Sequence, residues 1–396
     1  MNCRNCDSTI PSSVLHLPDM PLAGGFLDGP QQFAEERRLA ITLCACGTCG
    51  LLQIEETVDP DVLFRHYAFS TSTVSTLVTH FQNYARWLAE EIQPRAVLEF
   101  GCNDGPLLTA LRDLGVRAVG VDAALNIVDV ARAKGLDVLP GYFSPPLVDD
   151  ILSRFGKVDI VTGSNCFAHN PNPAAILDAA RTVLSERGVF IVEVMSAADL
   201  LDKMQWDTLY HEHLAVYSLT SLSWLLERHG WTVVDVFHVP MHAGSLRVVA
   251  SPRLDARPSS RVGDMLAAEA SLGLSQVATW VSFGRRVEQH IAMVGRVLSS
   301  VAGSGRIWAY GASGRATMWM NAANMSYIEK VVDASPLRAG KLMPGLHTPI
   351  VFPDEMVQDP PDYCLITAWN YADEIRAKEG WYRGTWVTPL PTLTFY

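Results

Sequence analysis

The amino-acid sequence predicts an α/β protein with a central doubly wound parallel sheet, a small cysteine-containing N-terminal module and a C-terminal Rossmann-like domain. Three observations lead to this prediction. Strand-like apolar runs alternate with helix-like segments through the middle of the chain, which is typical of a parallel sheet covered on both faces. Strand-like runs end in glycine turns at Gly101 and again at Gly311. Two Cys-x-x-Cys pairs lie within the first fifty residues.

The composition limits the kind of protein that this chain can be. Its 396 residues suffice for about two to three domains, and we place them at residues 1–80, 81–255 and 256–396. The net charge of −11 disfavours nucleic acid as a partner, because phosphate backbones are bound by cationic surfaces. The sequence has no run of 18 apolar residues and no apolar signal core near residue 1. We therefore expect a soluble, cytoplasmic protein without a membrane partner.

The cysteines of the first fifty residues predict a metal site. Cys3-x-x-Cys6 and Cys46-x-x-Cys49 are two tight turns that each offer two thiolates, and zinc in structural sites takes four ligands. Cys44 is an alternative to Cys46, because strand alternation would place both side chains on one face, but the two-residue spacing favours Cys46. A disulfide pair and a redox dithiol are the other interpretations. Four thiolates leave no open coordination position, so we expect the zinc to be structural.

Periodicity and turn residues define the expected helices and strands. An amphipathic helix runs through Phe81, Tyr84 and Trp87 and ends before Pro94. One long helix over about residues 264–300 is expected to lead to the third domain. Strands are expected at residues 97–100, 117–121, 137–139, 158–164, 188–194, 232–238 and 244–250 of the central domain, and from residue 306 and at residues 328–332 and 363–367 of the third.

The turn after the first central strand indicates which ligand the sheet binds. Residues 99–105 read Glu-Phe-Gly-Cys-Asn-Asp-Gly, with an acid two positions before the first glycine. A dinucleotide would require Gly-x-Gly-x-x-Gly at this turn, although it too would use an acid after the second strand. Asp122 closes that second strand and could accept hydrogen bonds from two ribose hydroxyls. These features favour S-adenosylmethionine, with contacts expected from Glu99, Gly101, Asn103, Asp104, Gly105, Asp122 and Asn165.

Two further segments carry groups suited to acid and base chemistry. Residues 210–213 read Tyr-His-Glu-His, and residues 165–169 read Asn-Cys-Phe-Ala-His; each follows an expected central strand. Both would lie near the sheet edge at which such folds bind ligands. Acid and base work is favoured, with metal binding by His211 and His213 or a simple polar turn as alternatives. The glycine turn at Gly311 could bind a phosphate or could only pack closely.

Motifs along nearly the whole chain carry a resemblance to a known family. They are the two cysteine pairs with Gly50-Leu51-Leu52-Gln53, residues 98–105, Phe167-Ala168-His169, Tyr210-His211-Glu212-His213, His242-Ala243-Gly244-Ser245-Leu246-Arg247, Tyr310-Gly311-Ala312, Val332-Asp333-Ala334-Ser335-Pro336, Pro344-Gly345 and residues 368–375. With these motifs in this order, the chain resembles the sugar C-methyltransferases that act on nucleotide-linked 4-keto-deoxyhexoses in antibiotic pathways. The resemblance implies a zinc-binding N-terminal domain, an S-adenosylmethionine-binding central domain and a nucleotide-linked sugar as substrate.

The resemblance also implies a reaction and roles for five residues. In this family the proton at C3 of the sugar is removed beside the C4 ketone, and the enolate attacks the methyl group of S-adenosylmethionine. By motif, His213 is expected to be the general base, and Tyr210 and Glu212 to hold the sugar and support the enolate. His169 and Tyr67 are expected to line the same cavity. A neutral imidazole suits this proton transfer near pH 7, because a proton beside a ketone is only weakly acidic.

Two departures from the family pattern affect the expected sugar pocket. Phe69 stands where the family usually has tyrosine, and Arg315 stands where it usually has lysine. The first removes a hydroxyl, and the second keeps the charge but changes its geometry. Two other functions are weighed against the sugar enzyme. One is a methyltransferase of the same architecture with a non-sugar acceptor; the other is a zinc-stabilised binding protein, which the intact segment 210–213 disfavours.

Overall fold

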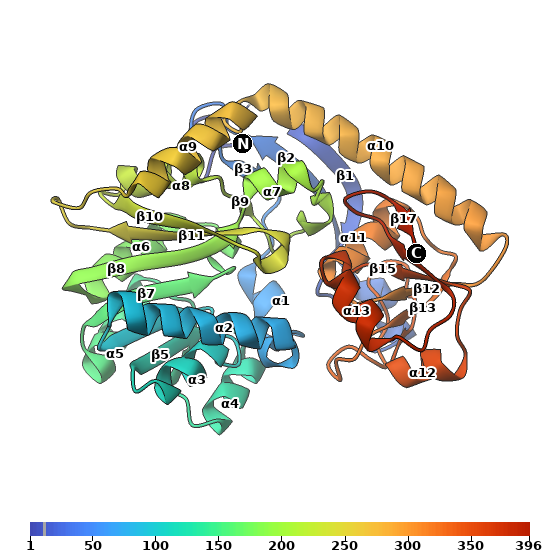
Figure 1. Ribbon diagram of the computed structural model, residues 1–396, viewed down its shortest axis with the longest axis horizontal. Helices are drawn as coiled ribbons and strands as arrows, with labels where there is room; N and C mark the ends of the chain where they lie inside the picture. Colours follow the sequence, from blue (N-terminus) through green and yellow to red (C-terminus); the bar gives the residue numbers. More distant parts are fainter. Residues whose placement is uncertain (11–12) are drawn as a thin grey trace.

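The computed structural model describes residues 1–10 and 13–396 and contains three sheets, of which the central one has seven strands (Figure 1). These strands are β4 (Ala96–Phe100), β5 (Arg117–Asp122), β6 (Val138–Pro140), β7 (Val158–Ser164), β8 (Leu184–Met195), β10 (Thr232–Val239) and β11 (Ser245–Ser251). Their order in the sheet is β10-β11-β8-β7-β4-β5-β6. β4 to β8 run parallel, and β11 is antiparallel to both neighbours. The predicted doubly wound α/β class is confirmed.

Helices cover both faces of the central sheet because its strands are apolar on both sides. Successive side chains of a strand point to opposite faces. Accordingly, Leu98 packs with apolar residues of α5, α6 and α8, whereas its neighbour Val97 packs with those of α2 and α3. Nearly continuous apolar strands of this kind are typical of buried parallel sheets. The helices concerned are α2 (Ser75–Trp87), α3 (Pro106–Asp113), α5 (Pro145–Phe155), α6 (Pro173–Val183) and α8 (Leu219–Arg228).

The order of the central strands places a ligand site beside β4. From β4 the chain adds β5 and β6 on one side, with α4 (Leu125–Ala133) between them, and then returns to add β7 and β8 on the other side. The loops at the carboxyl ends of β4 and β7 therefore diverge in opposite directions. Such a switch point leaves a crevice in which α/β sheets bind their ligands.

The N-terminal module is a four-stranded antiparallel sheet that borrows one strand from the central part of the chain. Its strands are β1 (Ser13–Pro21), β2 (Arg38–Ala45), β3 (Leu52–Ile54) and β9 (Ala215–Val216), in that order. β9 begins two residues after the predicted catalytic segment 210–213. The N-terminal sheet is thereby built directly onto that segment.

The C-terminal domain contains a six-stranded sheet in the order β14-β13-β12-β15-β16-β17. Five of the strands are parallel, and the last, β17, is antiparallel to β16. This arrangement confirms the Rossmann-like prediction for this part, although the sequence indicated only three of the strands. The elements are β12 (Ile307–Tyr310), α11 (Gly314–Ala322), β13 (Ile328–Val332), β14 (Ile350–Val351), α12 (Pro353–Gln358), β15 (Tyr363–Ile366), α13 (Ala372–Lys378), β16 (Thr385–Thr388) and β17 (Thr394–Phe395).

Two helices, and not the single long helix expected over about residues 264–300, connect the central and C-terminal domains (Figure 1). α9 (Ser260–Leu272) ends at Gly273, whose φ of 67° is a left-handed conformation that favours glycine. α10 (Val277–Ala302) then begins, and Trp280 donates a hydrogen bond from Nε1 to the Leu274 carbonyl oxygen across the break at 2.7 Å. The helical spacing of apolar residues continues across a break this short, so the sequence pattern predicted a single helix. No helix in the described residues has the length and apolar character needed to cross a membrane.

Candidate active site and zinc centre

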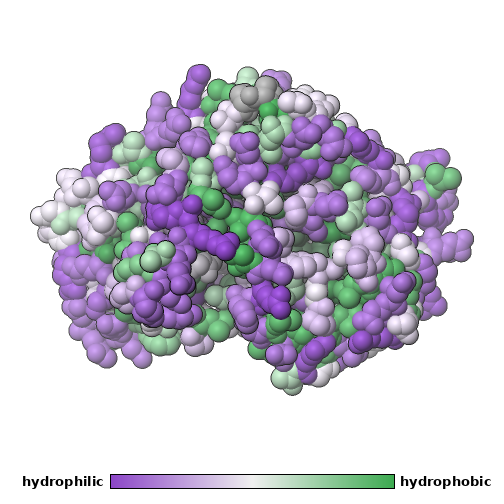
Figure 2. Space-filling view, turned by 180° about the vertical axis from the view of Figure 1, so that it is seen from behind, coloured by the Kyte–Doolittle hydropathy of each residue, from purple (hydrophilic) through white to green (hydrophobic). Residues whose placement is uncertain are grey.

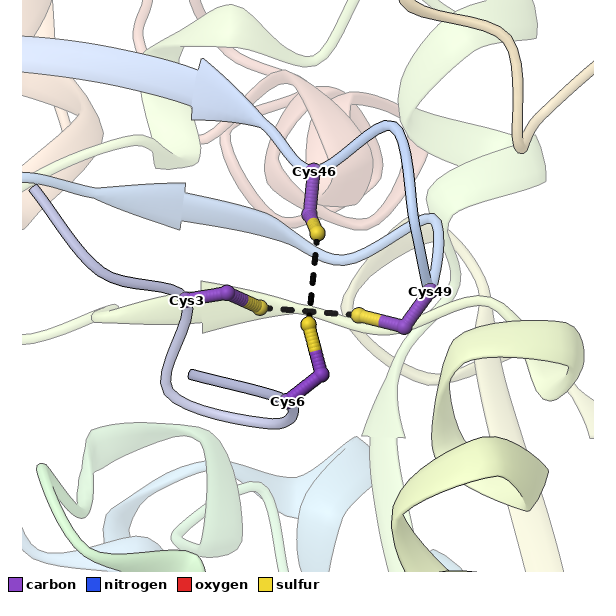
Figure 3. A group of neighbouring side chains, drawn as sticks. All are labelled: Cys3, Cys6, Cys46 and Cys49. Carbon is purple, nitrogen blue, oxygen red and sulfur yellow. Dashed lines mark hydrogen bonds between the residues drawn. The ribbon is translucent and has the colours of Figure 1, made fainter. Parts of the chain in front are cut away.

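Four buried cysteine side chains of the N-terminal module point to a common centre (Figure 3). Cys3, Cys6, Cys46 and Cys49 have all their sulfur atoms within 4.8 Å of one another. The Cys3 and Cys49 sulfurs are 3.5 Å apart, as are those of Cys6 and Cys46. Tetrahedral zinc with Zn–S bonds of about 2.3 Å would separate its sulfur ligands by about 3.8 Å, so this set fits zinc. Cys44 lies outside the set, and its sulfur contacts the Thr42 carbonyl oxygen at 3.9 Å.

The N-terminal sheet holds the backbone of the predicted catalytic segment. Ile54 of β3 donates a backbone hydrogen bond to the Leu214 carbonyl oxygen at 3.0 Å, and β9 then pairs with β3. His211 directs Nε2 to the Ala40 carbonyl oxygen of β2 at 3.1 Å, so its imidazole helps to hold the segment 210–213 on the N-terminal sheet. Among the described residues, neither His211 nor His213 belongs to a metal-binding group. The four cysteines therefore stabilise the sheet on which the segment 210–213 rests.

One cavity of about 610 Å³ is lined by residues of the N-terminal module, the central domain and the C-terminal domain. Gly24 and Phe26 come from the module, and Ser313 and Arg315 come from the C-terminal domain. Seen from behind, the largely hydrophilic surface is indented at its lower edge between two lobes (Figure 2). A cavity bounded by three parts of the chain can bring two reactants together away from solvent.

The turn after β4, residues 101–105, which we call the donor loop, lines this cavity together with residues at the carboxyl ends of β5 and β7. Gly101, Asn103, Asp122 and Asn165 all line it. Asp122 accepts backbone hydrogen bonds from Asn103 at 2.8 Å and from Ala124 at 2.9 Å, which fixes its carboxylate at the wall. Burial raises the pKa of this carboxyl group. A fixed acceptor at the end of the second strand suits the ribose hydroxyls of S-adenosylmethionine.

The other three residues expected to contact the donor are Glu99, Asp104 and Gly105, and they do not line the cavity. Glu99 is buried, and its Oε2 has no hydrogen-bond partner among the described residues. Burial, followed by the charge of Asp122, raises the pKa of Glu99 well above its usual value. A Cβ at Gly105 would lie 2.2 Å from the Leu136 side chain, so this glycine serves close packing. An orphaned buried carboxyl beneath a glycine loop fits a ligand that donates hydrogen bonds, as S-adenosylmethionine does.

The side chains of the donor loop also hold residues 66–73, which we call the strap. Asn103 accepts from the Thr71 backbone at 2.8 Å and donates to the Phe69 carbonyl oxygen at 3.1 Å. Asp104 accepts from the Ser70 hydroxyl at 2.8 Å, and burial and these contacts place it away from the cavity. No local pattern in the sequence indicated that these two side chains would hold residues 66–73. The strap is thus fastened directly to the donor loop.

Asn126 fastens the other end of the strap and was missed by the sequence analysis. Its side chain accepts a hydrogen bond from the Tyr67 backbone at 3.0 Å and donates one to the Tyr67 carbonyl oxygen at 2.9 Å. The Tyr67 hydroxyl donates in turn to Glu212 Oε2 at 3.2 Å inside the cavity. Burial raises the pKa of Glu212 to about 7. Tyr67 and Glu212, which are 145 residues apart in sequence, are therefore brought into one pair.

His213 has the protonation pattern that a general base needs. Its Nδ1 lies 2.6 Å from the Thr208 carbonyl oxygen, which can only accept, so Nδ1 carries the proton and Nε2 carries the lone pair. Nε2 has no hydrogen-bond partner among the described residues, and the side chain lines the cavity. Burial and the neighbouring His169 lower the pKa of His213 well below its usual value. The imidazole is therefore neutral at pH 7, with its lone pair on Nε2.

Aromatic rings surround His213 on the cavity side. His169 stacks on it with ring centroids 5.0 Å apart, and burial lowers the pKa of His169 to about 4. The Tyr210 ring lies 4.0 Å from the His213 ring. Gly314 of α11 abuts Tyr210, because a Cβ there would lie 2.8 Å from the tyrosine ring. The five residues to which the resemblance assigns a role at the substrate all line this one cavity; they are Tyr67, His169, Tyr210, Glu212 and His213.

A buried carboxylate links the C-terminal domain to the loop before the segment 210–213. Asp207 accepts hydrogen bonds from Trp319 Nε1 at 3.1 Å, Trp369 Nε1 at 2.8 Å and Arg315 Nη1 at 2.7 Å. These three donors come from the C-terminal domain, and Arg315 also lines the cavity. The sequence analysis singled out Arg315 but not Asp207, because a lone acid in a loop has no local signature. The pairing ties both domains to the same wall of the cavity.

Comparisons with known proteins cover the whole of this architecture. A family model described as a zinc binding domain matches residues 3–64, one described as a methyltransferase domain matches residues 70–236, and one described as a C-methyltransferase C-terminal domain matches residues 240–391. C-methyltransferase NovU from Streptomyces niveus is 33% identical over 401 residues, which are 98% of this chain and 95% of that protein.

Other proteins match only a part of the chain. The ubiquinone biosynthesis O-methyltransferase of Bordetella avium is 31% identical over 103 residues, which are 26% of this chain and 43% of that protein. The solved structure of magnesium protoporphyrin IX methyltransferase from Synechocystis PCC 6803 has a TM-score of 0.34 and 15% identity, covering 44% of this chain and 82% of that chain. The match to NovU alone, among these three, extends through the zinc-binding and C-terminal parts.

Proposed function

Because the chain belongs to the C-methyltransferase family that includes NovU and depends on S-adenosylmethionine, we propose that it methylates C3 of a nucleotide-linked 4-keto-deoxysugar through an enolate. The observation that carries this proposal is the neutral His213, whose free Nε2 lines the cavity that the donor loop also lines. We also propose the domain division 1–80, 81–255 and 256–396. The zinc-binding module keeps its metal as a structural element.

Proton abstraction is the step that the chain itself must perform. His213 Nε2 takes the proton from C3 of the sugar, and the C–H electron pair forms a C3–C4 double bond while the C4 oxygen becomes an enolate. The Thr208 carbonyl stabilises the resulting imidazolium, because Nδ1–H points at it from 2.6 Å. Bound S-adenosylmethionine supplies an electrophilic methyl group to C3. His169 and Tyr210 pack on the imidazole and hold its plane.

Glu212 is placed to support the enolate oxygen. With a pKa of about 7, a large share of this carboxyl is protonated at neutral pH and can donate a hydrogen bond to a developing oxyanion. Tyr67 donates to Oε2, which leaves Oε1, the oxygen next to the cavity residue Gly24, to carry the proton. Asn126 holds the Tyr67 backbone and so fixes this pair. The arrangement supports a substrate with a ketone beside the methylated carbon.

The C-terminal wall of the cavity supports a substrate that carries phosphate. The N-terminus of α11, capped by Ser313, and the side chain of Arg338 both line the cavity. Arg338 is held by Asp333 at 3.2 Å, and its buried Nε has no hydrogen-bond partner among the described residues. Backbone N–H groups at a helix start and a guanidinium are the groups that bind diphosphates. A nucleotide linked to the sugar would place its diphosphate here.

Mass spectrometry of nucleotide-linked 4-keto-6-deoxysugars incubated with the protein and S-adenosylmethionine in heavy water tests the proposed function. We expect a product heavier by one methyl group and deuterium at C3 of recovered substrate, because the proton on His213 exchanges with solvent. The same sugars without the 4-keto group are the control and should give neither signal. Donor binding without methylation of any sugar would contradict the proposal and favour a non-sugar acceptor.

The pH dependence of turnover is expected to report Glu212. If the protonated carboxyl supports the enolate, kcat falls as the pH rises through about 7, because Glu212 loses its proton there. His213 gives no acidic limb near neutrality, because its pKa lies well below its usual value. The measurement is kcat from pH 5.5 to 9 with saturating substrates. Glu212→Gln keeps an N–H donor that does not titrate, so we expect about tenfold lower kcat and no basic limb.

Tyr67→Phe provides a directional control for this assignment. The hydrogen bond from Tyr67 lowers the pKa of Glu212, against the burial that raises it. Its removal should therefore raise that pKa and move the basic limb to higher pH. A limb that stays in place in Tyr67→Phe, or that persists in Glu212→Gln, would show that another group causes it.

A further inference from the structure

A buried ion pair beside the cavity holds a histidine that the proposed reaction does not use. Glu193 of β8 is fully buried, and Arg247 of β11 places Nε and Nη2 2.7 and 2.6 Å from its Oε1. His80 of α2 places Nε2 2.8 Å from Oε2. Burial alone would raise the pKa of Glu193, but the contacts with His80 and Arg247 lower it to about 2. Because an ionised carboxylate only accepts, His80 Nε2 carries a proton and donates it to this bond.

The contacts of His80 fix its ring and engage only one of the two ring nitrogens. The Arg247 guanidinium lies over the Tyr84 ring at 3.8 Å and the Trp87 ring at 5.1 Å, and both rings belong to the same helix as His80. The His80 side chain is 10% exposed and lines the cavity. Nδ1 has no hydrogen-bond partner among the described residues. Nδ1 is therefore the nitrogen that can meet a ligand.

The place of His80 corresponds to the amino-acid end of the donor. Asp122, which suits the ribose, ends β5, whereas Glu193 lies near the end of β8 on the other side of β4. These strands are three positions apart, which is about 14 Å at the usual strand spacing, and side chains reaching inward shorten that span. A donor whose ribose lies at Asp122 and that crosses the glycine loop therefore directs its methionine moiety toward His80. Asn165, between the two, donates its backbone N–H to the Glu193 carbonyl oxygen at 2.8 Å.

The charges around His80 favour an anionic group at Nδ1. The charges of Glu193 and Arg247 cancel each other. With a ligand carboxylate at Nδ1, His80 would lie between two carboxylates and would donate a hydrogen bond to each of them from one ring nitrogen. Three further histidines of the cavity are neutral at pH 7, because burial lowers the pKa of His169 and of His242 to about 4 and that of His213 well below its usual value. They are poor partners for an anion.

We propose that His80, oriented by the buried Glu193–Arg247 pair, binds the α-carboxylate of the methionine moiety of S-adenosylmethionine. This assignment concerns donor binding and does not depend on the acceptor. A failure of the sugar assignment would leave it standing. His80 is a binding residue that keeps the donor extended across the glycine loop and so directs its methyl group into the shared cavity.

Calorimetric binding of two stable ligands to the zinc-loaded full chain tests this proposal. The first is S-adenosylhomocysteine, and the second is its decarboxylated analogue S-adenosyl-3-thiopropylamine. A charged hydrogen bond lost on decarboxylation should weaken binding to the wild-type protein by about 10- to 100-fold. Equal affinity of the wild-type protein for both ligands would overturn the proposal without any variant being needed.

His80→Gln is the matched variant, because a glutamine amide can still donate to Glu193 and keep that carboxylate satisfied. We expect S-adenosylhomocysteine to bind about 10- to 100-fold more weakly to it, and the decarboxylated analogue to bind within about threefold of the wild-type affinity. The preference for the carboxylate should thus disappear. His66→Gln, the same change at an exposed histidine of the strap that also lines the cavity, should leave the preference intact. Equal weakening of both ligands by His80→Gln, or an unchanged preference, would overturn the proposal.

Discussion

His213→Ala is expected to slow methyl transfer by about 10²- to 10⁴-fold while leaving the affinity for S-adenosylmethionine within about threefold of the wild-type value. The effect should be this large because the neutral imidazole is held with its lone pair free on Nε2 by the Thr208 carbonyl oxygen at 2.6 Å. The donor affinity should persist because Asp122 and the glycine loop lie at another wall of the cavity. Single-turnover methyl transfer and calorimetric titration with S-adenosylhomocysteine measure the two quantities separately.

His211→Gln is the matched control for this prediction. His211 is two residues away, but it directs Nε2 to the Ala40 carbonyl oxygen of the N-terminal sheet, and a glutamine amide can donate to the same atom. Its turnover should stay within about threefold of the wild-type value, since the imidazole touches no substrate. In heavy water, His213→Ala should also lose the deuterium wash-in at C3. Wash-in that survives in His213→Ala would identify a different base in the cavity.

Local patterns in the sequence were sufficient for the parts of the site that one strand and its turn define. The predicted strand at residues 158–164 coincides with β7, and the glycine loop after β4 faces the cavity as expected. Asp122 could be placed because an acid at the end of the second strand has a fixed position relative to that loop. These features depend on residues within about thirty positions of one another. Hydrophobic periodicity and turn chemistry report such short distances directly.

Contacts between distant segments could not be read in the same way. Asn126 binds the backbone of Tyr67 across 59 residues, and Asp207 accepts from Trp369 across 162 residues. An amide or a carboxylate that binds backbone or indole N–H groups has no characteristic spacing in sequence. For the same reason Asn103, expected to touch the donor, was not expected to hold the strap. Such residues become identifiable only once the fold has brought their partners together.

The origin of β9 shows how a module boundary can escape sequence analysis. Its two residues, Ala215 and Val216, are too few to give a periodic signal, and they complete a sheet whose other strands lie in the first 54 residues. Tertiary pairing decides their conformation, as it often does for short strands. This pairing makes the zinc-binding module part of the active-site framework.

Cys46→Ser is expected to lose zinc, to destabilise the N-terminal sheet and to lower turnover by at least about a hundredfold. Structural zinc contributes about 10–16 kcal/mol of apparent binding free energy in small zinc-binding folds, which is comparable to the stability of a whole domain at about 5–15 kcal/mol. Cys46 joins the turn after β2 to the N-terminal turn through its contact with Cys6. Zinc content per chain, thermal unfolding and single-turnover kinetics measure the three effects.

Cys44→Ser distinguishes the zinc ligand Cys46 from Cys44, which lies two residues earlier in β2. The Cys44 sulfur faces the Thr42 carbonyl oxygen and lies outside the four-sulfur group, so this variant should bind one zinc ion per chain and keep its turnover. The opposite pattern, with zinc lost in Cys44→Ser and kept in Cys46→Ser, would assign the site to the other cysteine.

The kinetic outcome of Cys46→Ser distinguishes two roles for the zinc-binding module. β3 pairs with β9, and Ile54 holds the Leu214 carbonyl oxygen at 3.0 Å, one residue beyond His213. A base displaced by about 1 Å costs on the order of a hundredfold in rate, so loosening this sheet should reduce turnover far more than donor affinity. Hydrogen exchange should then rise at β3 and β9 together. Normal turnover in a chain that has lost its zinc would mean that the central domain positions His213 by itself.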